Sequence, residues 1–106
     1  MNEKEKYLGE FEQMAMLAIL QLADNAYGAT IRKLLLESVN REVKVGALYV
    51  TLDRLEAKGM LVSTTEVGGE QRGGRPKRFF KVTAAGESAL KRARQAFNTL
   101  WQPVSI

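Results

Sequence analysis

The chain has 106 residues, of which 45% are hydrophobic and 26% charged, so its size and composition predict one globular domain. It contains no cysteine and no histidine, which excludes disulfides, thiol catalysis and zinc sites built from these residues. The net charge of +4 is uneven: residues 1–40 hold 4 Lys/Arg and 6 Asp/Glu, whereas residues 41–106 hold 12 and 6. This asymmetry is typical of a face that binds a polyanion, or of a solvated basic surface.

The N-terminal region predicts neither a signal peptide nor a membrane span. Its first apolar run, residues 14–20, is too short to cross a bilayer. Four glutamates (Glu3, Glu5, Glu10 and Glu12) precede that run, which is the wrong charge for the leading region of a signal peptide. We therefore expect a cytoplasmic protein with no membrane partner, and the absence of cysteine agrees with that compartment.

The first helix is predicted over residues 9–23 and is apolar on every face through its middle. A helix of this kind is buried on all sides. A chain this small cannot cover it alone, so we expect a second copy to cover part of it, with Met14 and Leu17 in the interface.

Two more helices are predicted, over residues 27–40 and 46–58, because apolar residues recur there at helical spacing. Between them, residues 43–45 (Val-Lys-Val) are expected to form a short strand. Gly59 suits the left-handed position that ends a helix. The inward face of the third helix consists of Leu48, Leu52 and Leu55.

A β-hairpin is predicted next, from strands over residues 60–66 and 77–82. Alternation places Phe80 and Val82 on one face of the second strand. The glycine-rich tip between the strands holds neither a Walker nor a dinucleotide-binding pattern. Four basic residues lie in this tip and the strand after it: Arg72, Arg75, Lys77 and Arg78.

The last helix is predicted to follow the N-cap Thr83 and to run over residues 84–101. Its apolar residues step by three and four, as in a coiled-coil seam, although a simple amphipathic helix gives nearly the same pattern. The fold class is therefore mainly α with a small β-hairpin. We expect a winged helix-turn-helix DNA-binding domain in residues 1–83 and a C-terminal dimerisation helix in residues 84–106.

The third helix is the candidate recognition helix. Small residues at its start permit close approach to DNA, and its tyrosine and arginine reach phosphates or base edges. The alternative is an ordinary surface helix. The candidate contacts are Gly46, Ala47, Tyr49, Val50 and Arg54.

The hairpin tip is a candidate wing, because its glycines and its basic residues suit a phosphate backbone or a minor groove. The alternative is a mobile, solvated loop. On the last helix, the aromatic residues suit a dimer interface or the core, or else they line a pocket for a small apolar effector. The interface and pocket candidates are Met14, Leu17, Leu90, Phe97, Leu100 and Trp101.

Several segments resemble the PadR family of bacterial regulators, over about residues 8–90. The most specific is the wing, GGRPKRFF at residues 73–80; the others are LGEFEQ at 8–13, AYG at 26–28, GALY at 46–49, RLEAKG at 54–59 and VTAAG at 82–86. The resemblance implies a homodimer whose C-terminal helix packs against the partner's first helix, and repression by operator binding. It also implies release by a small molecule in some members. It assigns DNA contact to the third helix and the wing, and we add Tyr27 from the AYG segment.

Two other classes of function compete with a DNA-binding repressor. A winged helix also serves as a protein-interaction scaffold, which would show an apolar patch rather than a basic wing. An enzyme would need a carboxylate or lysine site, and the scattered acidic residues form no evident pair. We therefore predict double-stranded DNA as the partner, with no catalytic residues, no metal and no cofactor.

Overall fold

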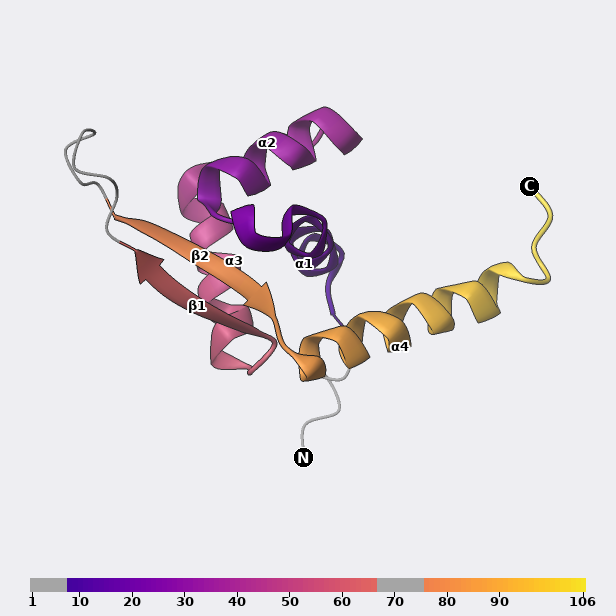
Figure 1. Ribbon diagram of the computed structural model, residues 1–106. Coiled ribbons are helices and arrows are strands. Elements are labelled where there is room, and N and C mark those ends of the chain that lie inside the picture. The colour runs from indigo at the N-terminus through magenta and orange to yellow at the C-terminus, as the bar shows by residue number, and fades with distance from the viewer. Residues whose placement is uncertain (1–7, 67–75) are drawn as a thin grey trace.

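Three helices, a β-hairpin and a fourth helix follow one another along the chain (Figure 1). The computed structural model describes residues 8–66 and 76–106. The elements are α1 (Glu10–Leu22), a 3-10 turn η2 (Ala23–Asn25), α2 (Gly28–Val39), α3 (Val45–Ala57), β1 (Leu61–Glu66), β2 (Lys77–Val82) and α4 (Ala84–Trp101). The predicted fold class is confirmed: a mainly helical chain with one antiparallel hairpin.

The core lies where α1, α2 and α3 meet the inner face of the hairpin. Apolar residues spaced three or four apart on each helix turn towards this point, and alternate residues of the strands join them. The largest fully buried side chains are Phe80, Met16, Ile19, Ile31, Leu48, Leu52, Leu55 and Leu61.

The end of α3 fixes where the hairpin starts. Gly59 has a φ of 81°, the left-handed conformation that the sequence predicts for it. The Gly59 N–H donates to the Glu56 carbonyl at 3.0 Å, and the Met60 N–H donates to the Leu55 carbonyl at 2.9 Å. This pair of bonds closes the helix as a Schellman motif and sends the chain directly into β1.

The strand predicted at residues 43–45 is wrong. Val45 is the first residue of α3, and Lys44 is its N-cap, with its carbonyl accepting the Leu48 N–H at 3.0 Å. Val43 is buried. Its carbonyl accepts a hydrogen bond from Arg32 Nε at 2.8 Å, and not from the backbone N–H of a neighbouring strand.

The segment that pairs with the hairpin comes from before α2. The Phe80 N–H donates to the Ala26 carbonyl at 2.9 Å, and Tyr27 forms an isolated antiparallel bridge with Phe79. The start of α2 is therefore fixed to the outer edge of β2.

Helix α4 is held to the domain by its first half only. Thr83 caps it as predicted, with its Oγ1 accepting the Gly86 N–H at 3.0 Å and donating to the Gly59 carbonyl at 2.7 Å. Ala89 and Ala93 are buried, whereas the second half of the helix runs away from the other helices (Figure 1). There Phe97 is 57% exposed and Leu100 is 66% exposed. This part of the helix presents a large apolar surface that the other described residues do not cover.

We expect Gly86→Ala to destabilise the protein by about 1–3 kcal/mol, the usual cost of overpacking. A Cβ at Gly86 would collide with the Met60 carbonyl oxygen and lie 2.7 Å from Val82 Cγ1 and 2.9 Å from Met16 Cε. This collision outweighs the roughly 1 kcal/mol by which alanine favours a helix over glycine. Urea unfolding at a fixed protein concentration measures the change. Ser88→Ala, at an exposed position of the same helix, is the control, and equal stability of the two variants would contradict the prediction.

Candidate nucleic-acid interface

Helix α3 presents its N-terminal half to solvent. Gly46 and Ala47 are exposed, and Val50 is 56% exposed, while Leu48 and Leu52 point into the core. A Cβ built at Gly46 would meet no atom of the described residues within 4 Å. The backbone at the start of α3 is therefore accessible to a large partner, with only short side chains in the way.

The side chain of Tyr49 is only partly accessible on this face of α3. It is half-buried, and its ring lies 6.3 Å from that of Phe80. A Cβ at Gly28 would lie 2.5 Å from the Tyr49 hydroxyl oxygen, so Gly28 makes room for the phenol at the first turn of α2. Tyr49 thus connects α3 with α2, with its hydroxyl against Gly28. Arg54, one turn further along α3, is exposed.

The tip end of β2 carries a second group of predicted contacts, beside the start of α2. Lys77 Nζ lies 4.6 Å from the centre of the Tyr27 ring, and that ring meets Phe79 edge-on at 5.3 Å. Tyr27 and Lys77, both named from the sequence, are therefore neighbours at the junction of α2 and the wing. The predicted contacts Arg72 and Arg75 lie outside the described residues.

Arg78, the other predicted wing contact, is engaged with α3. Its guanidinium forms ion pairs with Glu56 at 2.7 Å and Asp53 at 2.8 Å, and its Nε donates to Ser63 Oγ at 3.1 Å. The hydrogen bonds from Arg78 and Ser63 lower the pKa of Glu56. Charge clustering in the sequence did not reveal these partners. Strand alternation is the signal that would have found them, because Arg78 shares its face of β2 with the buried Phe80.

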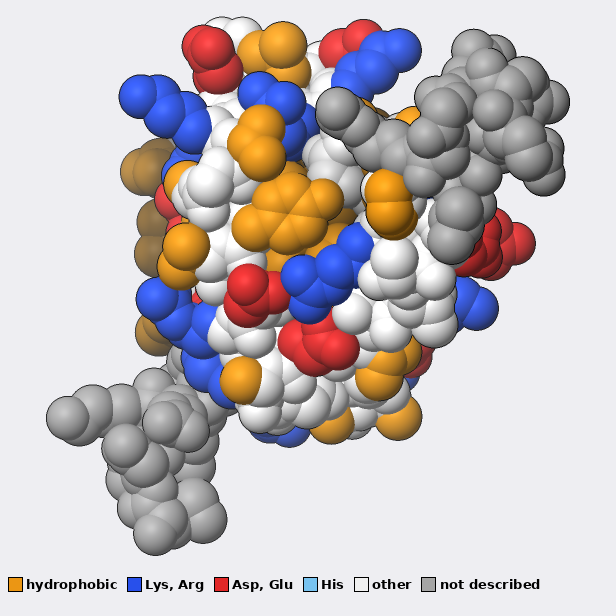
Figure 2. All heavy atoms as spheres, turned by 90° about the vertical axis from the view of Figure 1, so that its left-hand side faces the viewer, with side chains coloured by type: hydrophobic (Ala, Val, Ile, Leu, Met, Phe, Trp, Pro, Cys, Tyr) orange, Lys and Arg blue, Asp and Glu red, His pale blue; other side chains and the backbone are white. Residues whose placement is uncertain are grey.

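Figure 2 shows the molecule from the side of the wing, the left-hand side of Figure 1. Lys and Arg side chains are scattered around a central apolar group, and acidic side chains lie against one of the basic ones. The surface is therefore a mixture of basic, acidic and apolar groups.

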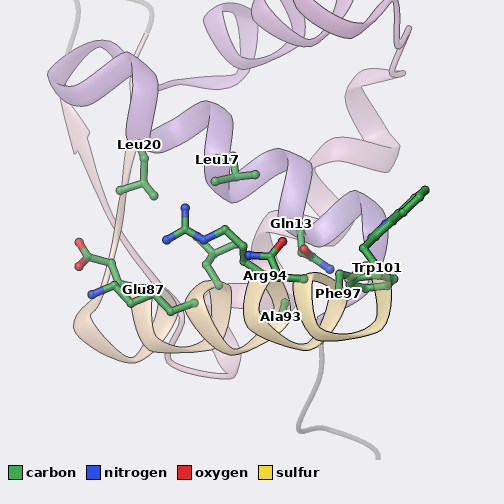
Figure 3. Close-up of a pocket in the computed structure, with 11 residues that line it drawn as sticks. Gln13, Leu17, Leu20, Glu87, Ala93, Arg94, Phe97 and Trp101 are labelled. Atoms are coloured by element: carbon green, nitrogen blue, oxygen red, sulfur yellow. The ribbon is translucent and has the colours of Figure 1, made fainter. Parts of the chain in front are cut away.

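A groove of about 610 Å³ separates α1 from α4 on another part of the molecule. In Figure 3, Leu17 and Leu20 point from α1 towards α4, and Phe97 and Trp101 lie at the far end of the groove. Leu17 is 47% exposed and Trp101 is 55% exposed. Two other predicted interface residues are less accessible, since Met14 is half-buried and Leu90 is buried within the chain.

Comparison with known proteins decides the family. Residues 16–92 match the family described as Transcriptional regulator PadR-like family, which is most of the 106-residue chain. The chain belongs to the PadR-like family of transcriptional regulators. The resemblance read from the sequence is confirmed, and transcriptional regulation rather than catalysis is the activity of this PadR-like chain.

Individual PadR-like relatives agree with this assignment. Transcriptional regulator Rv3488 of Mycobacterium tuberculosis is 42% identical over 98 residues, which cover 90% of this chain and 87% of that protein. A PadR-like transcription factor from Bacteroides fragilis has a similar structure, with a TM-score of 0.73 and 25% identity over 95% of this chain and 90% of the other. A PadR family transcriptional regulator from Eggerthella lenta DSM 2243 is also similar in structure. Its TM-score is 0.69, with 26% identity over 89% of this chain and 81% of the other. The winged-helix, DNA-binding fold of the family is therefore present in this chain.

Two other features are absent from the part of the chain that the structure describes. None of its helices combines the length and the apolar character needed to cross a membrane. Within the same residues, no group of three or more acidic side chains is arranged to hold a metal ion.

Proposed function

We propose that this PadR-like regulator is a repressor that binds an operator in duplex DNA as a homodimer. The observation that carries the proposal is the exposed, short-chained start of α3, beside a basic wing, in a winged-helix fold. A recognition helix enters the major groove with its N-terminal residues against base edges. Gly46 and Ala47 would approach the bases closely, with Val50 and Arg54 beside them. An occupied operator then excludes the transcription machinery.

The remaining predicted contacts would position the protein on the backbone. Tyr49, Tyr27 and Lys77 surround the junction of α2, α3 and the wing, where a phosphate strand would pass. Arg72 and Arg75 at the wing tip would reach a phosphate or a minor groove. Contacts of this kind fix register and orientation, while the face of α3 supplies sequence preference.

Dimerisation through α4 is part of the proposal. Residues 84–106 would serve as the dimerisation segment and residues 1–83 as the DNA-binding segment. The groove between α1 and α4 is open in one protomer and is lined by exposed apolar side chains, which a second copy would cover. A two-fold dimer would present two α3 helices to successive major grooves.

The groove also favours a second role, the binding of a small apolar effector. Phe97 and Trp101 line it, and its volume of about 610 Å³ is within the usual range for a ligand pocket. A flat apolar compound bound between two protomers would change the spacing of the two α3 helices and so release the operator. Quenching of the single tryptophan by apolar compounds tests this role directly.

Selection of binding sites from random duplex DNA tests the main proposal. The expected result is a palindrome whose half-sites are centred about 10 base pairs, or one helical turn, apart. Failure to enrich any sequence would refute operator binding, and enrichment of a single unpaired half-site would refute the dimer.

We also expect binding to weaken steeply with salt. If a dimer neutralises roughly eight phosphates, log affinity should fall with log salt at a slope of about −7, because each neutralised phosphate releases condensed counterions. Titration of the selected duplex at several salt concentrations measures the slope. A flat response between low and moderate salt would contradict the electrostatic part of the proposal.

A further inference from the structure

We propose that Arg78 is a positioning residue, which holds the wing against α3 so that both meet DNA as one surface, and that it does not itself contact phosphate. The inference rests on the DNA binding proposed above. It changes the role that the charge pattern suggested for Arg78 and brings in Asp53, Glu56 and Ser63, which that pattern did not single out.

The contacts of Arg78 occupy every nitrogen of its guanidinium. Nη1 pairs with Asp53 Oδ1 at 2.8 Å, Nη2 with Glu56 Oε1 at 2.7 Å, and Nε donates to Ser63 Oγ at 3.1 Å. The guanidinium also lies 4.8 Å from the centre of the Phe80 ring. Ser63 completes the network by donating to the Glu56 carboxylate at 2.9 Å. With a protein partner at each nitrogen, three of the five N–H donors are engaged, and the planar fork is oriented by α3 and Ser63.

The charge of the network argues in the same direction. One arginine and two carboxylates give a local charge of −1, which repels a phosphate rather than attracting it. The hydrogen bonds that Glu56 accepts lower its pKa, so it stays ionised under the usual conditions of a binding assay. The network is therefore a connection between elements, and the basic residues around it supply the attraction for DNA.

The position of Arg78 in the hairpin explains why such a connection is needed. At the base of the wing, Leu61 and Phe80 are each 1% exposed and anchor the strands in the core. Towards the tip, Thr65, which pairs with Arg78 across the hairpin, is exposed. Arg78 is the last residue of β2 on the inner face before the tip, one strand pair from the end of the ladder. It is thus the outermost link between the wing and α3.

The direction of the effect of Glu56→Gln on DNA affinity separates positioning from simple electrostatics. Removing a negative charge near bound DNA should strengthen binding if charge alone matters. Loss of a positioning contact should instead weaken binding to the selected duplex, by about five- to tenfold, a typical coupling for residues in one ion-pair network. Glu42→Gln is the matched control, because Glu42 is an exposed carboxylate close before α3, and it should bind as well as the wild type or better.

Salt titration of Arg78→Ala provides the second readout. The variant should lose affinity while keeping the wild-type slope of log affinity against log salt. If Arg78 contacts phosphate, the slope should become less steep by about 2 for a dimer. Arg78→Ala combined with Glu56→Gln should bind no more weakly than Arg78→Ala alone.

Hydrogen exchange in the absence of DNA provides a readout that does not depend on the proposed function. Amides of β1 and β2 near the tip should exchange faster in Glu56→Gln and Arg78→Ala, while those of α1 keep their protection. A wild type that binds no duplex would refute the proposed function alone. Tighter binding by Glu56→Gln, a less steep slope in Arg78→Ala, or unchanged exchange in the hairpin would overturn the positioning role.

Discussion

Replacing Phe97 and Trp101 together by alanine is expected to convert the proposed dimer into a monomer and to lower its DNA affinity by several orders of magnitude. The two side chains are 57% and 55% exposed in one protomer, so they are available for burial between two. Burying one large aromatic side chain stabilises by roughly 1.5–3 kcal/mol, and a dimer contains four of them. Sedimentation at micromolar concentration measures the mass, and titration of the operator duplex measures the affinity.

The loss of affinity follows without any change to a DNA contact. Two linked α3 helices bind paired half-sites with a high effective concentration for the second contact, which a monomer does not have. The protomer itself should stay folded, because Ala89 and Ala93, which fix α4 to the domain, are untouched. This expectation separates dissociation from unfolding in circular dichroism.

A matched control removes exposed apolar groups elsewhere. Leu36 and Val39 on α2 are 47% and 54% exposed and lie outside the α1–α4 groove. Leu36→Ala with Val39→Ala should leave the dimer intact. A well-folded wild-type monomer of 11.8 kDa at micromolar concentration would refute the dimer, the paired half-sites and the pocket between protomers.

The order of the elements could be predicted because its signals are local. Gly59 and Thr83 mark a helix end and a helix start through interactions within a few residues of themselves. The helical spacing of Leu48, Leu52 and Leu55 is also visible in a short stretch of chain. These features depend little on the rest of the fold, so the sequence alone was sufficient for them.

The strand predicted at residues 43–45 failed because its outcome depends on distant residues. Three residues of alternating type do not distinguish a strand from a loop that enters a helix. The side chain of Arg32 donates a hydrogen bond to the Val43 carbonyl. The free edge of β2 pairs with Ala26 and Tyr27 instead of with residues 43–45. Neither partner is near in sequence, so no local pattern contained this information.

For the candidate site, the sequence indicates which side chains are exposed better than it indicates which contacts they make. The exposed start of α3 follows from the inward leucines, which leave Gly46 and Ala47 on the other side. For Arg78, the number of basic residues in the wing suggested a DNA contact. Arg78 lies two residues from Phe80, on the same face of β2, and this position directs it towards α3. The packing of the Tyr49 ring against Gly28 depends on how α2 and α3 cross, which only the structure shows.

Gly46→Leu is expected to weaken binding to the proposed operator by about a hundredfold or more while leaving the fold intact. In the free protein a Cβ at Gly46 meets no described atom within 4 Å, so a side chain there has open space. Leucine is also a better helix former than glycine, by up to about 1 kcal/mol. On DNA the situation is reversed, because a major groove about 12 Å wide leaves little slack around a helix about 10–12 Å across.

A leucine at Gly46 would hold the backbone of α3 away from the base edges in both half-sites. At roughly 1–3 kcal/mol for each disrupted contact, the dimer should lose about a hundredfold or more in affinity for the operator. Ala57→Leu is the control, because Ala57 is exposed at the other end of the same helix, about 16 Å away at 1.5 Å per residue. Thermal unfolding of both variants should match or exceed that of the wild type. If Gly46→Leu binds the operator as tightly as Ala57→Leu does, the start of α3 does not face the DNA.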